Sequence, residues 1–143
     1  MLPAKKEFID QNKVMIVDDD EDDIYLMKKA LVRLQESARV NLDLTFILSG
    51  SEALGEIDRG LMDNALPDKI FLDLNMPGVN GLDVLQYCMA QEILDKVEVV
   101  VITTASDPDT HQAALARGAK SVCVKPNSLQ EMSDLVSRLL NIS

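Results

Sequence analysis

The sequence predicts an α/β protein built on a doubly wound, five-stranded parallel sheet. Five short apolar runs, rich in β-branched residues, lack the alternation of a sheet that faces water on one side, so helices are expected to cover both faces. Segments with a helical repeat of apolar residues lie between these runs. A chain that alternates strand and helix in this way forms parallel strands joined by right-handed crossovers.

Each expected strand is one of the apolar runs, and a helix follows it. The strands cover residues 14–17, 44–48, 70–72, 97–102 and 122–124. The apolar repeat of the first helix consists of Ile24, Met27, Leu31 and Leu34, and that of the last helix consists of Leu129, Met132, Val136 and Leu139.

Short polar motifs mark the ends of several helices. Residues 49–52 and 128–131 both read Ser-x-x-Glu, a capping box in which the serine hydroxyl and the glutamate carboxylate bind free backbone amides. Asp107 supplies a side-chain acceptor before a helix, and Pro108 occupies the first helical position. Two glycines stand where a left-handed residue would end a helix, Gly60 and Gly118.

Length and composition fit one globular domain that folds without disulfides or a structural metal. The chain has 143 residues, of which 47% are hydrophobic and 27% are charged, enough to bury one sizeable core. We expect residues 1–12 to form an N-terminal extension and the domain to cover 13–143. No linker, internal repeat or low-complexity stretch interrupts this domain.

The charge balance excludes several classes of partner. The chain carries 14 Lys and Arg against 24 Asp and Glu, a net charge of −10, which argues against binding to nucleic acid or to an anionic membrane surface. No apolar stretch is long enough to span a bilayer. Cys88 and Cys123 are expected to be small buried residues of a reduced, cytoplasmic protein. The single histidine, His111, excludes a histidine-rich zinc site and is expected on an exposed helix face.

Polar residues follow four of the expected strands, at the edge where ligands bind in an open α/β sheet. They are Asp18, Asp19 and Asp20 after the first strand, Asp73 after the third, Thr103 and Thr104 at the fourth, and Lys125 after the fifth. Carboxylates about 4 Å apart repel by roughly 4 kcal/mol at an effective dielectric constant near 20, so they must protonate, separate or recruit a cation. Oxygen ligands without His or Cys favour Mg²⁺.

This set of groups suits phosphoryl transfer. A magnesium ion held by Asp18, Asp19 and Asp73 would neutralise an incoming phosphoryl group, while Lys125 and the Thr103 hydroxyl bind its other oxygens. A carboxylate in this position can act as the nucleophile and form an aspartyl-phosphate. Asp73 is the best candidate, because it is isolated from the acidic run and opens a tight loop.

Four motifs in this order resemble the receiver domain of two-component response regulators, of the stand-alone CheY-like type. They are Val17-Asp18-Asp19, residues 73–82 with the sequence Asp-Leu-Asn-Met-Pro-Gly-Val-Asn-Gly-Leu, Ile102-Thr103-Thr104 and Val124-Lys125-Pro126. The resemblance covers residues 13–140. It implies a flavodoxin-like (βα)5 fold with strand order 2-1-3-4-5 and a receiver domain over 13–143.

The resemblance implies a role for each acid of the site. Asp73 would be the phosphoacceptor and, with Lys125, would form the catalytic pair. Asp19 and Asp73 would bind Mg²⁺ directly together with the backbone carbonyl of Asn75, and Asp18 would bind it partly through water.

The resemblance also assigns the phosphate-binding groups. Thr103, with Thr104 beside it, would carry the switch hydroxyl that turns toward the phosphoryl group. Lys125 would pair with a phosphoryl oxygen, and the peptide bond between Lys125 and Pro126 would be cis, as in similar domains.

Other positions set this chain apart within the group that it resembles. Asn75 and Ala105 lie where the family tunes the lifetime of the aspartyl-phosphate. Val122 and Asn127 stand where aromatic residues are common, so the output surface is expected to move differently or less. Two long connections resemble those of stand-alone regulators that serve phytochrome-like kinases, residues 35–44 and 60–68.

The partners follow from the same resemblance. The phosphoryl group would come from a phosphohistidine on a sensor histidine kinase or a histidine phosphotransfer protein. The change would be read on the surface formed by 107–117 and 121–140, by a downstream protein target or in a phosphorelay, and a homodimer is expected through this surface. The chain ends at Ser143, so we expect no attached output domain.

Two other functions stay open. A Mg²⁺-dependent phosphohydrolase with an aspartyl-phosphate intermediate resembles haloacid-dehalogenase-like enzymes, but Asn75 stands at the position of their general acid and there is no cap insertion. A pseudo-receiver would be an interaction module that takes no phosphoryl group. The complete set of acids, hydroxyl and lysine argues against it.

The acidic run 18–23 has a simpler interpretation as a solvated loop. Its position directly after a buried strand favours a ligand site instead. Asp22 and Asp23 need no ligand, because in the first turn of the next helix they would stabilise its positive end.

Overall fold

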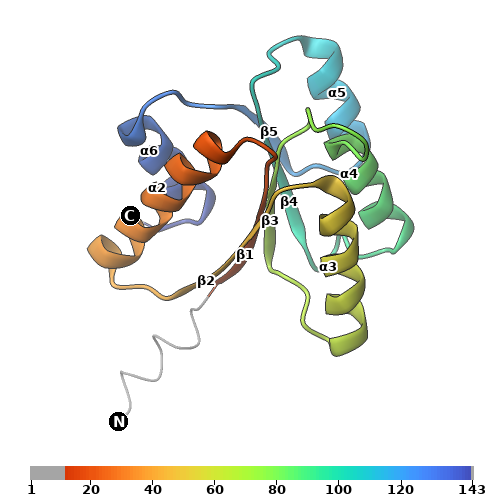
Figure 1. The fold of residues 1–143 in the computed structure, drawn as a ribbon, viewed down its shortest axis with the longest axis horizontal. Coiled ribbons are helices and arrows are strands. Elements are labelled where there is room, and N and C mark those ends of the chain that lie inside the picture. Colours follow the sequence, from red (N-terminus) through yellow and green to blue (C-terminus); the bar gives the residue numbers. More distant parts are fainter. Residues whose placement is uncertain (1–11, 143) are drawn as a thin grey trace.

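The fold is described by a computed structural model for residues 12–142. Five parallel strands form one sheet in the order β2-β1-β3-β4-β5. Figure 1 shows α2 and α6 on one face of this sheet and α3, α4 and α5 on the other. The doubly wound α/β class and the strand order 2-1-3-4-5 are therefore confirmed. Of the expected extension 1–12, only Asn12 lies within the described residues, and it opens β1.

Strands and helices alternate along the described chain. The strands are β1 (Asn12–Val17), β2 (Leu42–Ile47), β3 (Lys69–Leu72), β4 (Glu98–Thr103) and β5 (Ser121–Val124). The helices are α2 (Glu21–Ala38), α3 (Gly50–Asp63), α4 (Gly81–Ala90), α5 (Pro108–Ala116) and α6 (Leu129–Leu139). Every expected strand is present, with ends shifted slightly because polar residues such as Asn12 also pair in the ladder. None of these helices has the length and apolar character needed to cross a membrane.

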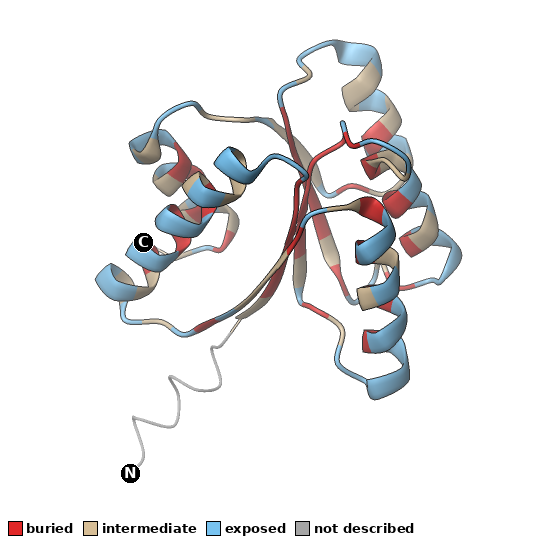
Figure 2. Ribbon diagram, in the orientation of Figure 1, coloured by how far each residue is buried: buried red, intermediate tan, exposed pale blue. Residues whose placement is uncertain are grey.

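The core consists of two apolar layers, one on each face of the sheet. In β1, Val14 and Ile16 pack into the layer under α2 and α6, whereas Met15 and Val17 pack into the layer under α3 and α4. Side chains on a strand alternate between faces, so two buried faces require the unbroken apolar runs seen in the sequence. Figure 2 shows the buried residues concentrated along the strands and on the inner sides of the helices.

Polar residues cap the N-terminus of each described helix. The capping residues are Asp20, Ser49, Asn80, Asp107 and Ser128. Ser49 and Ser128 each accept a backbone N–H bond at 3.1 Å. Their hydroxyls also donate to the carboxylates of Glu52 and Glu131, which in a capping box would instead accept the backbone N–H of the serine. The reciprocal capping box instead joins Asn80 and Asp83. The capping role of Asp107, with Pro108 in the first turn, is confirmed.

The two glycines expected to end helices behave differently. Gly118 follows α5 with φ +101°, as expected. The role predicted for Gly60 is wrong, because this residue lies inside α3. The helix ends at Asp63 and is capped by Asn64, which has φ 54°. A Cβ at Gly60 would lie 3.2 Å from the Ala65 carbonyl oxygen. The small size of glycine therefore lets the chain fold back closely across the end of the helix.

Candidate functional site

Backbone hydrogen bonds place three charged residues at one edge of the sheet. Asp18, Asp73 and Lys125 each follow the last residue of a strand. Their N–H groups donate to the last carbonyl oxygens of β2, β1 and β4, at 3.0, 3.0 and 2.8 Å. Each residue thus extends the parallel ladder by one position, and the sheet itself holds its side chain at the carboxyl edge.

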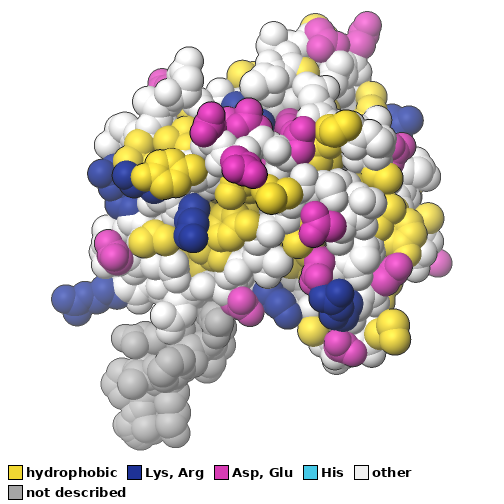
Figure 3. All heavy atoms as spheres, viewed as in Figure 1, with side chains coloured by type: hydrophobic (Ala, Val, Ile, Leu, Met, Phe, Trp, Pro, Cys, Tyr) yellow, Lys and Arg dark blue, Asp and Glu magenta, His cyan; other side chains and the backbone are white. Residues whose placement is uncertain are grey.

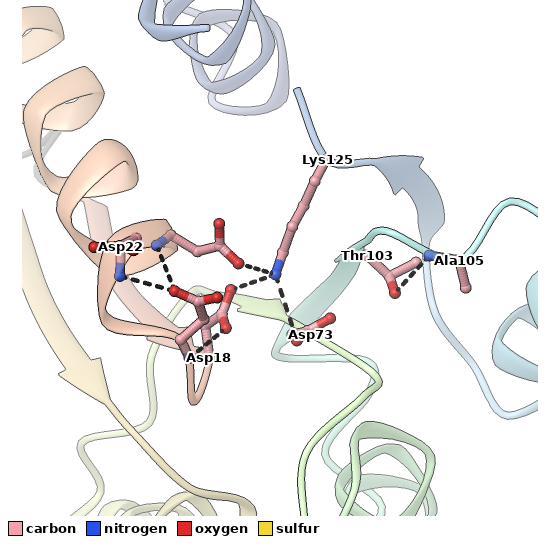
Figure 4. Close-up of polar contacts among 8 residues, drawn as sticks. Asp18, Asp22, Asp73, Thr103, Ala105 and Lys125 are labelled. Carbon is pink, nitrogen blue, oxygen red and sulfur yellow. Dashed lines mark hydrogen bonds and ion pairs between the residues drawn. The ribbon is translucent and has the colours of Figure 1, made fainter. Parts of the chain in front are cut away.

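The Lys125 ammonium group lies among three carboxylates (Figure 4). Its Nζ is 2.6 Å from Asp23 Oδ2, 2.8 Å from Asp18 Oδ2 and 3.4 Å from Asp73 Oδ2. The lysine side chain is 9% exposed, so these ion pairs are largely removed from water and little screened by salt. An ammonium group has three N–H donors, and here each has a carboxylate to meet.

Three carboxylates converge at the same edge of the sheet. Asp18, Asp19 and Asp73 each offer an oxygen, and these oxygens lie within 4.8 Å of one another. Asp18 and Asp73 are buried, whereas Asp19 is exposed. Asp73 Oδ1 is buried and accepts no hydrogen bond from the described part of the chain. A hard cation would satisfy this oxygen and offset the repulsion among the acids, so the donor set fits Mg²⁺.

Burial and neighbouring charge act in opposite directions on these groups. Burial raises the pKa of Asp73 above its ordinary value, although the positive charge of Lys125 acts to lower it. Burial also raises the pKa of Asp18, although the hydrogen bond from Lys125 acts to lower it. For Lys125, burial alone would lower the pKa, but hydrogen bonds to Asp18 and Asp23 raise it above the usual range. The lysine therefore stays charged, and negative charge remains in excess around it.

The Thr103 hydroxyl points away from Asp73 (Figure 4). Thr103 is fully buried at the end of β4, and its Oγ1 accepts the Ala105 N–H at 3.3 Å. His111 Nε2 lies 2.7 Å from the Ala105 carbonyl oxygen, and because a carbonyl can only accept, this nitrogen carries the hydrogen. His111 is thus half-buried, and its expected exposure is wrong. Thr104 is exposed and makes no hydrogen bond to the described residues.

One expectation about the Lys-Pro pair must be corrected. The bond between Lys125 and Pro126 is trans, as are the other described peptide bonds. The trans form of a bond before proline is intrinsically favoured by about 0.5–1 kcal/mol, so the dipeptide itself does not require the cis form. Val122 is half-buried against the core, and Asn75 is exposed in the loop after Asp73.

The loop after Asp73 packs tightly against the start of α4. The Gly81 N–H donates to the Leu74 carbonyl oxygen at 3.0 Å. A Cβ at Gly81 would lie 2.3 Å from the Asp73 carbonyl oxygen and 2.7 Å from Leu74 Cα. Position 81 therefore needs glycine, because the backbone beneath the Asp73 carboxylate passes directly over it.

We expect Gly81→Ala to lower the free energy of unfolding by about 1–3 kcal/mol, because the added methyl group must displace the backbone of Asp73. Gly55→Ala is the matched control: Gly55 lies in α3, and nothing stands within 4 Å of an added Cβ. That control should gain roughly 0.5–1 kcal/mol from helix propensity. Urea unfolding of both variants measures the difference. A Gly81→Ala protein as stable as the control would contradict this packing.

Asp23 is a site residue that sequence reasoning missed. The sequence predicts only that it stabilises the positive end of α2, but it forms the shortest of the ion pairs with Lys125. The Asp20 carboxylate accepts the N–H groups of Asp22 and Asp23, which fixes the first helical turn beside the strand ends. Its position in the sequence could have indicated this role, because a helix that starts next to the site can direct a side chain of its first turn into the site.

Acidic side chains dominate the surface around this edge, as Figure 3 shows above the start of α2. Asp19, Asp20, Glu21 and Asp22 are all exposed there. A concentration of negative charge raises the local concentration of cations. The surface thus favours the divalent ion that the buried acids could bind.

Comparison with known proteins gives a consistent answer. A family model described as the response regulator receiver domain matches residues 14–137. The transcriptional regulatory protein PrrA of Mycobacterium tuberculosis is 33% identical over 129 residues, which cover 90% of this chain and 49% of PrrA. The probable methanogenesis regulatory protein FilR2 of Methanothrix harundinacea is 28% identical over 142 residues, and the match covers 97% of this chain and 85% of FilR2. The chain thus spans about half the length of PrrA.

Solved structures show the same architecture. The phosphorylated cyanobacterial phytochrome response regulator RcpA is 27% identical with a TM-score of 0.78, and the match covers 90% of this chain and 91% of RcpA. The Mn²⁺-bound response regulator Rcp1 is 23% identical with a TM-score of 0.76, covering 90% of this chain and 94% of Rcp1, which shows a shared fold. The chain therefore belongs to the receiver domains of response regulators, a signalling family that is phosphorylated on aspartate.

Proposed function

We propose that Asp73 accepts a phosphoryl group from a phosphohistidine on a sensor histidine kinase or a histidine phosphotransfer protein. One observation carries the proposal: the Asp73 carboxylate lies buried at the sheet edge, 3.4 Å from the Lys125 ammonium group. Its second oxygen, Oδ1, has no hydrogen-bond partner among the described residues. A nucleophile and its countercharge are thus held together in a low-dielectric site.

The transfer step needs few groups from the protein. An oxygen of Asp73 forms the new P–O bond while the P–N bond to the donor imidazole breaks, and the electron pair of that bond stays with the leaving nitrogen. Lys125, whose Nζ is 3.4 Å from Asp73 Oδ2, would then move closer and donate to a phosphoryl oxygen. Asp73 and Lys125 are the catalytic pair of this proposal.

The proposed cofactor is Mg²⁺, held by Asp18, Asp19, Asp73 and the backbone carbonyl of Asn75. When bound, the ion supplies positive charge that offsets the charge of the phosphoryl oxygens. The convergence of three carboxylate oxygens within 4.8 Å supports this assignment. The excess of acids over the single lysine means that the protein alone does not neutralise the site.

The proposed switch is the Thr103 hydroxyl. It now accepts the Ala105 N–H and would turn to donate to a phosphoryl oxygen, with the exposed Thr104 beside it. Because Thr103 is buried, this turn would shift the connection between β4 and α5. Asn75 and Ala105, on the two loops next to Asp73, would set the lifetime of the aspartyl-phosphate.

We infer that the output is docking of a downstream protein on the surface formed by α5, β5 and α6. The match to RcpA, a cyanobacterial phytochrome response regulator, supports a phytochrome-like kinase as the phosphodonor. A stand-alone, cytoplasmic regulator stays a prediction. A homodimer through the same surface stays a prediction. The phosphohydrolase and the pseudo-receiver are the alternatives that the following experiment tests.

The test is incubation with acetyl phosphate and Mg²⁺, followed by intact-mass measurement. The wild-type protein is expected to gain the mass of one phosphoryl group, and EDTA or Asp73→Asn should abolish the gain. Asp95→Asn is the matched control, because Asp95 is exposed and lies before β4, far from the carboxyl ends of the strands. No mass change in the wild type would favour the pseudo-receiver. Continuous release of phosphate from phosphate esters would favour the hydrolase.

A further inference from the structure

We propose that Asp23 is a positioning residue that holds Lys125 away from Asp73 and thereby slows phosphorylation. The inference rests on the proposed function, because it concerns the rate at which Asp73 takes a phosphoryl group. Its basis is the order of the three ion pairs: Lys125 Nζ is 2.6 Å from Asp23 but 3.4 Å from Asp73.

The ammonium group has no donor to spare. Its three N–H groups already face the carboxylates of Asp18, Asp23 and Asp73. Figure 4 labels Asp18 and Asp73 beside the ammonium group. A phosphoryl group on Asp73 adds further acceptor oxygens and more negative charge at the same place. To donate to a phosphoryl oxygen as the P–O bond forms, Lys125 must move toward Asp73, which lengthens its shorter contacts with Asp18 and Asp23.

Asp23 is the partner that can be released. The Asp18 side chain is 9% exposed and its backbone N–H is part of the sheet ladder, so an unpaired carboxylate there would be costly. The Asp23 side chain is 33% exposed and comes from the first turn of α2, so water can replace Lys125 as its partner. The Asp23 contact is therefore the one that yields more easily, and until it lengthens it holds Lys125 back from the phosphoryl group.

The neighbouring residue provides a matched comparison. Asp22 lies in the same helical turn and carries the same charge, but it is exposed and makes no ion pair with Lys125. Asp22→Asn and Asp23→Asn remove one negative charge at nearly the same place. A difference between the phosphorylation rates of these two variants therefore reports the direct contact of Asp23 with Lys125 and not the general electrostatic field of the acidic surface.

The experiment compares phosphorylation rates with acetyl phosphate and Mg²⁺. In this reaction an oxygen of Asp73 forms the new P–O bond as the bond between phosphorus and the acetate oxygen breaks, and acetate leaves with the electron pair of that bond. Asp23→Asn is expected to react about three- to tenfold faster than Asp22→Asn. This ratio corresponds to the free energy that a partly exposed, charged hydrogen bond contributes. Asp23→Glu keeps a carboxylate for Lys125 and should stay within roughly twofold of the wild type.

A second measurement reports the contact without any phosphoryl transfer. By NMR, the Lys125 ammonium hydrogens should exchange with water faster in Asp23→Asn than in Asp22→Asn. Equal rates in both measurements, or slower phosphorylation of Asp23→Asn, would overturn the inference and leave the proposed function intact. If neither the wild type nor any variant gains a phosphoryl group, the proposed function fails and this inference fails with it.

Discussion

Lys125→Met is expected to lower the free energy of unfolding by about 3–5 kcal/mol at neutral pH without divalent cations. The lysine is the shared countercharge of two buried carboxylates and one half-buried carboxylate, and methionine keeps most of its apolar volume but none of its charge. Without Lys125, Asp18 and Asp73 would be left buried beside each other with no countercharge. Such uncompensated burial is far more costly than the loss of a surface ion pair.

Magnesium should restore much of this stability, because a cation bound to the acids replaces the missing positive charge. Urea unfolding with and without Mg²⁺ measures both effects. Lys120→Met is the matched control: Lys120 is exposed at the opposite end of β5, and its loss should change stability by about 0.5 kcal/mol or less. A Lys125→Met protein indistinguishable from this control would mean that the ion pairs contribute little.

Asp73→Asn is expected to act in the opposite direction and to raise the free energy of unfolding by about 1–3 kcal/mol without Mg²⁺. Asp73 Oδ1 is buried without a hydrogen bond among the described residues, and burial raises the pKa of Asp73 above its ordinary value of 3.8. Its ionised form is therefore less favourable in the folded protein than in the unfolded chain. Asparagine has nearly the same shape and no charge to desolvate.

The pH dependence gives the sign of this effect. Between pH 3.8 and the raised pKa, the folded protein binds more protons at Asp73 than the unfolded chain does, so stability falls as the pH rises through that window. The advantage of Asp73→Asn should accordingly be small at low pH, grow across the window and stay constant above it. Added Mg²⁺ should stabilise the wild type more than the variant. A variant less stable than the wild type at neutral pH would show that the Lys125 pair outweighs burial.

Much of the fold could be predicted because its signals are local. The apolar runs that became β1 and β3 are unbroken since both of their faces are buried, and that property is visible in the sequence. The caps at Asp107 and Ser128 act within one helical turn, so their motifs were readable in advance. The prediction for Gly60 is wrong because the small size of this residue serves a contact with Ala65, a need that the pattern of helix ends does not reveal.

The site was predictable in part. Asp18, Asp73 and Lys125 each come directly after a strand, and parallel strands bring their carboxyl ends to one edge whatever their order in the chain. Asp23 has no such marker, since it lies in a helix and reaches the site only because the fold places the first turn of α2 beside Lys125. The contact of His111 with the Ala105 carbonyl likewise carries no local signature.

The amino-acid sequence by itself determined the α/β class, the order of the elements and the acids, hydroxyl and amine that meet at the sheet edge, because strand periodicity and chain connectivity are one-dimensional properties. Only the tertiary structure decided which acid lies nearest to Lys125 and where the Thr103 hydroxyl points. The distances from Lys125 Nζ to its three carboxylates range only from 2.6 to 3.4 Å, so packing between elements distant along the chain decides such choices.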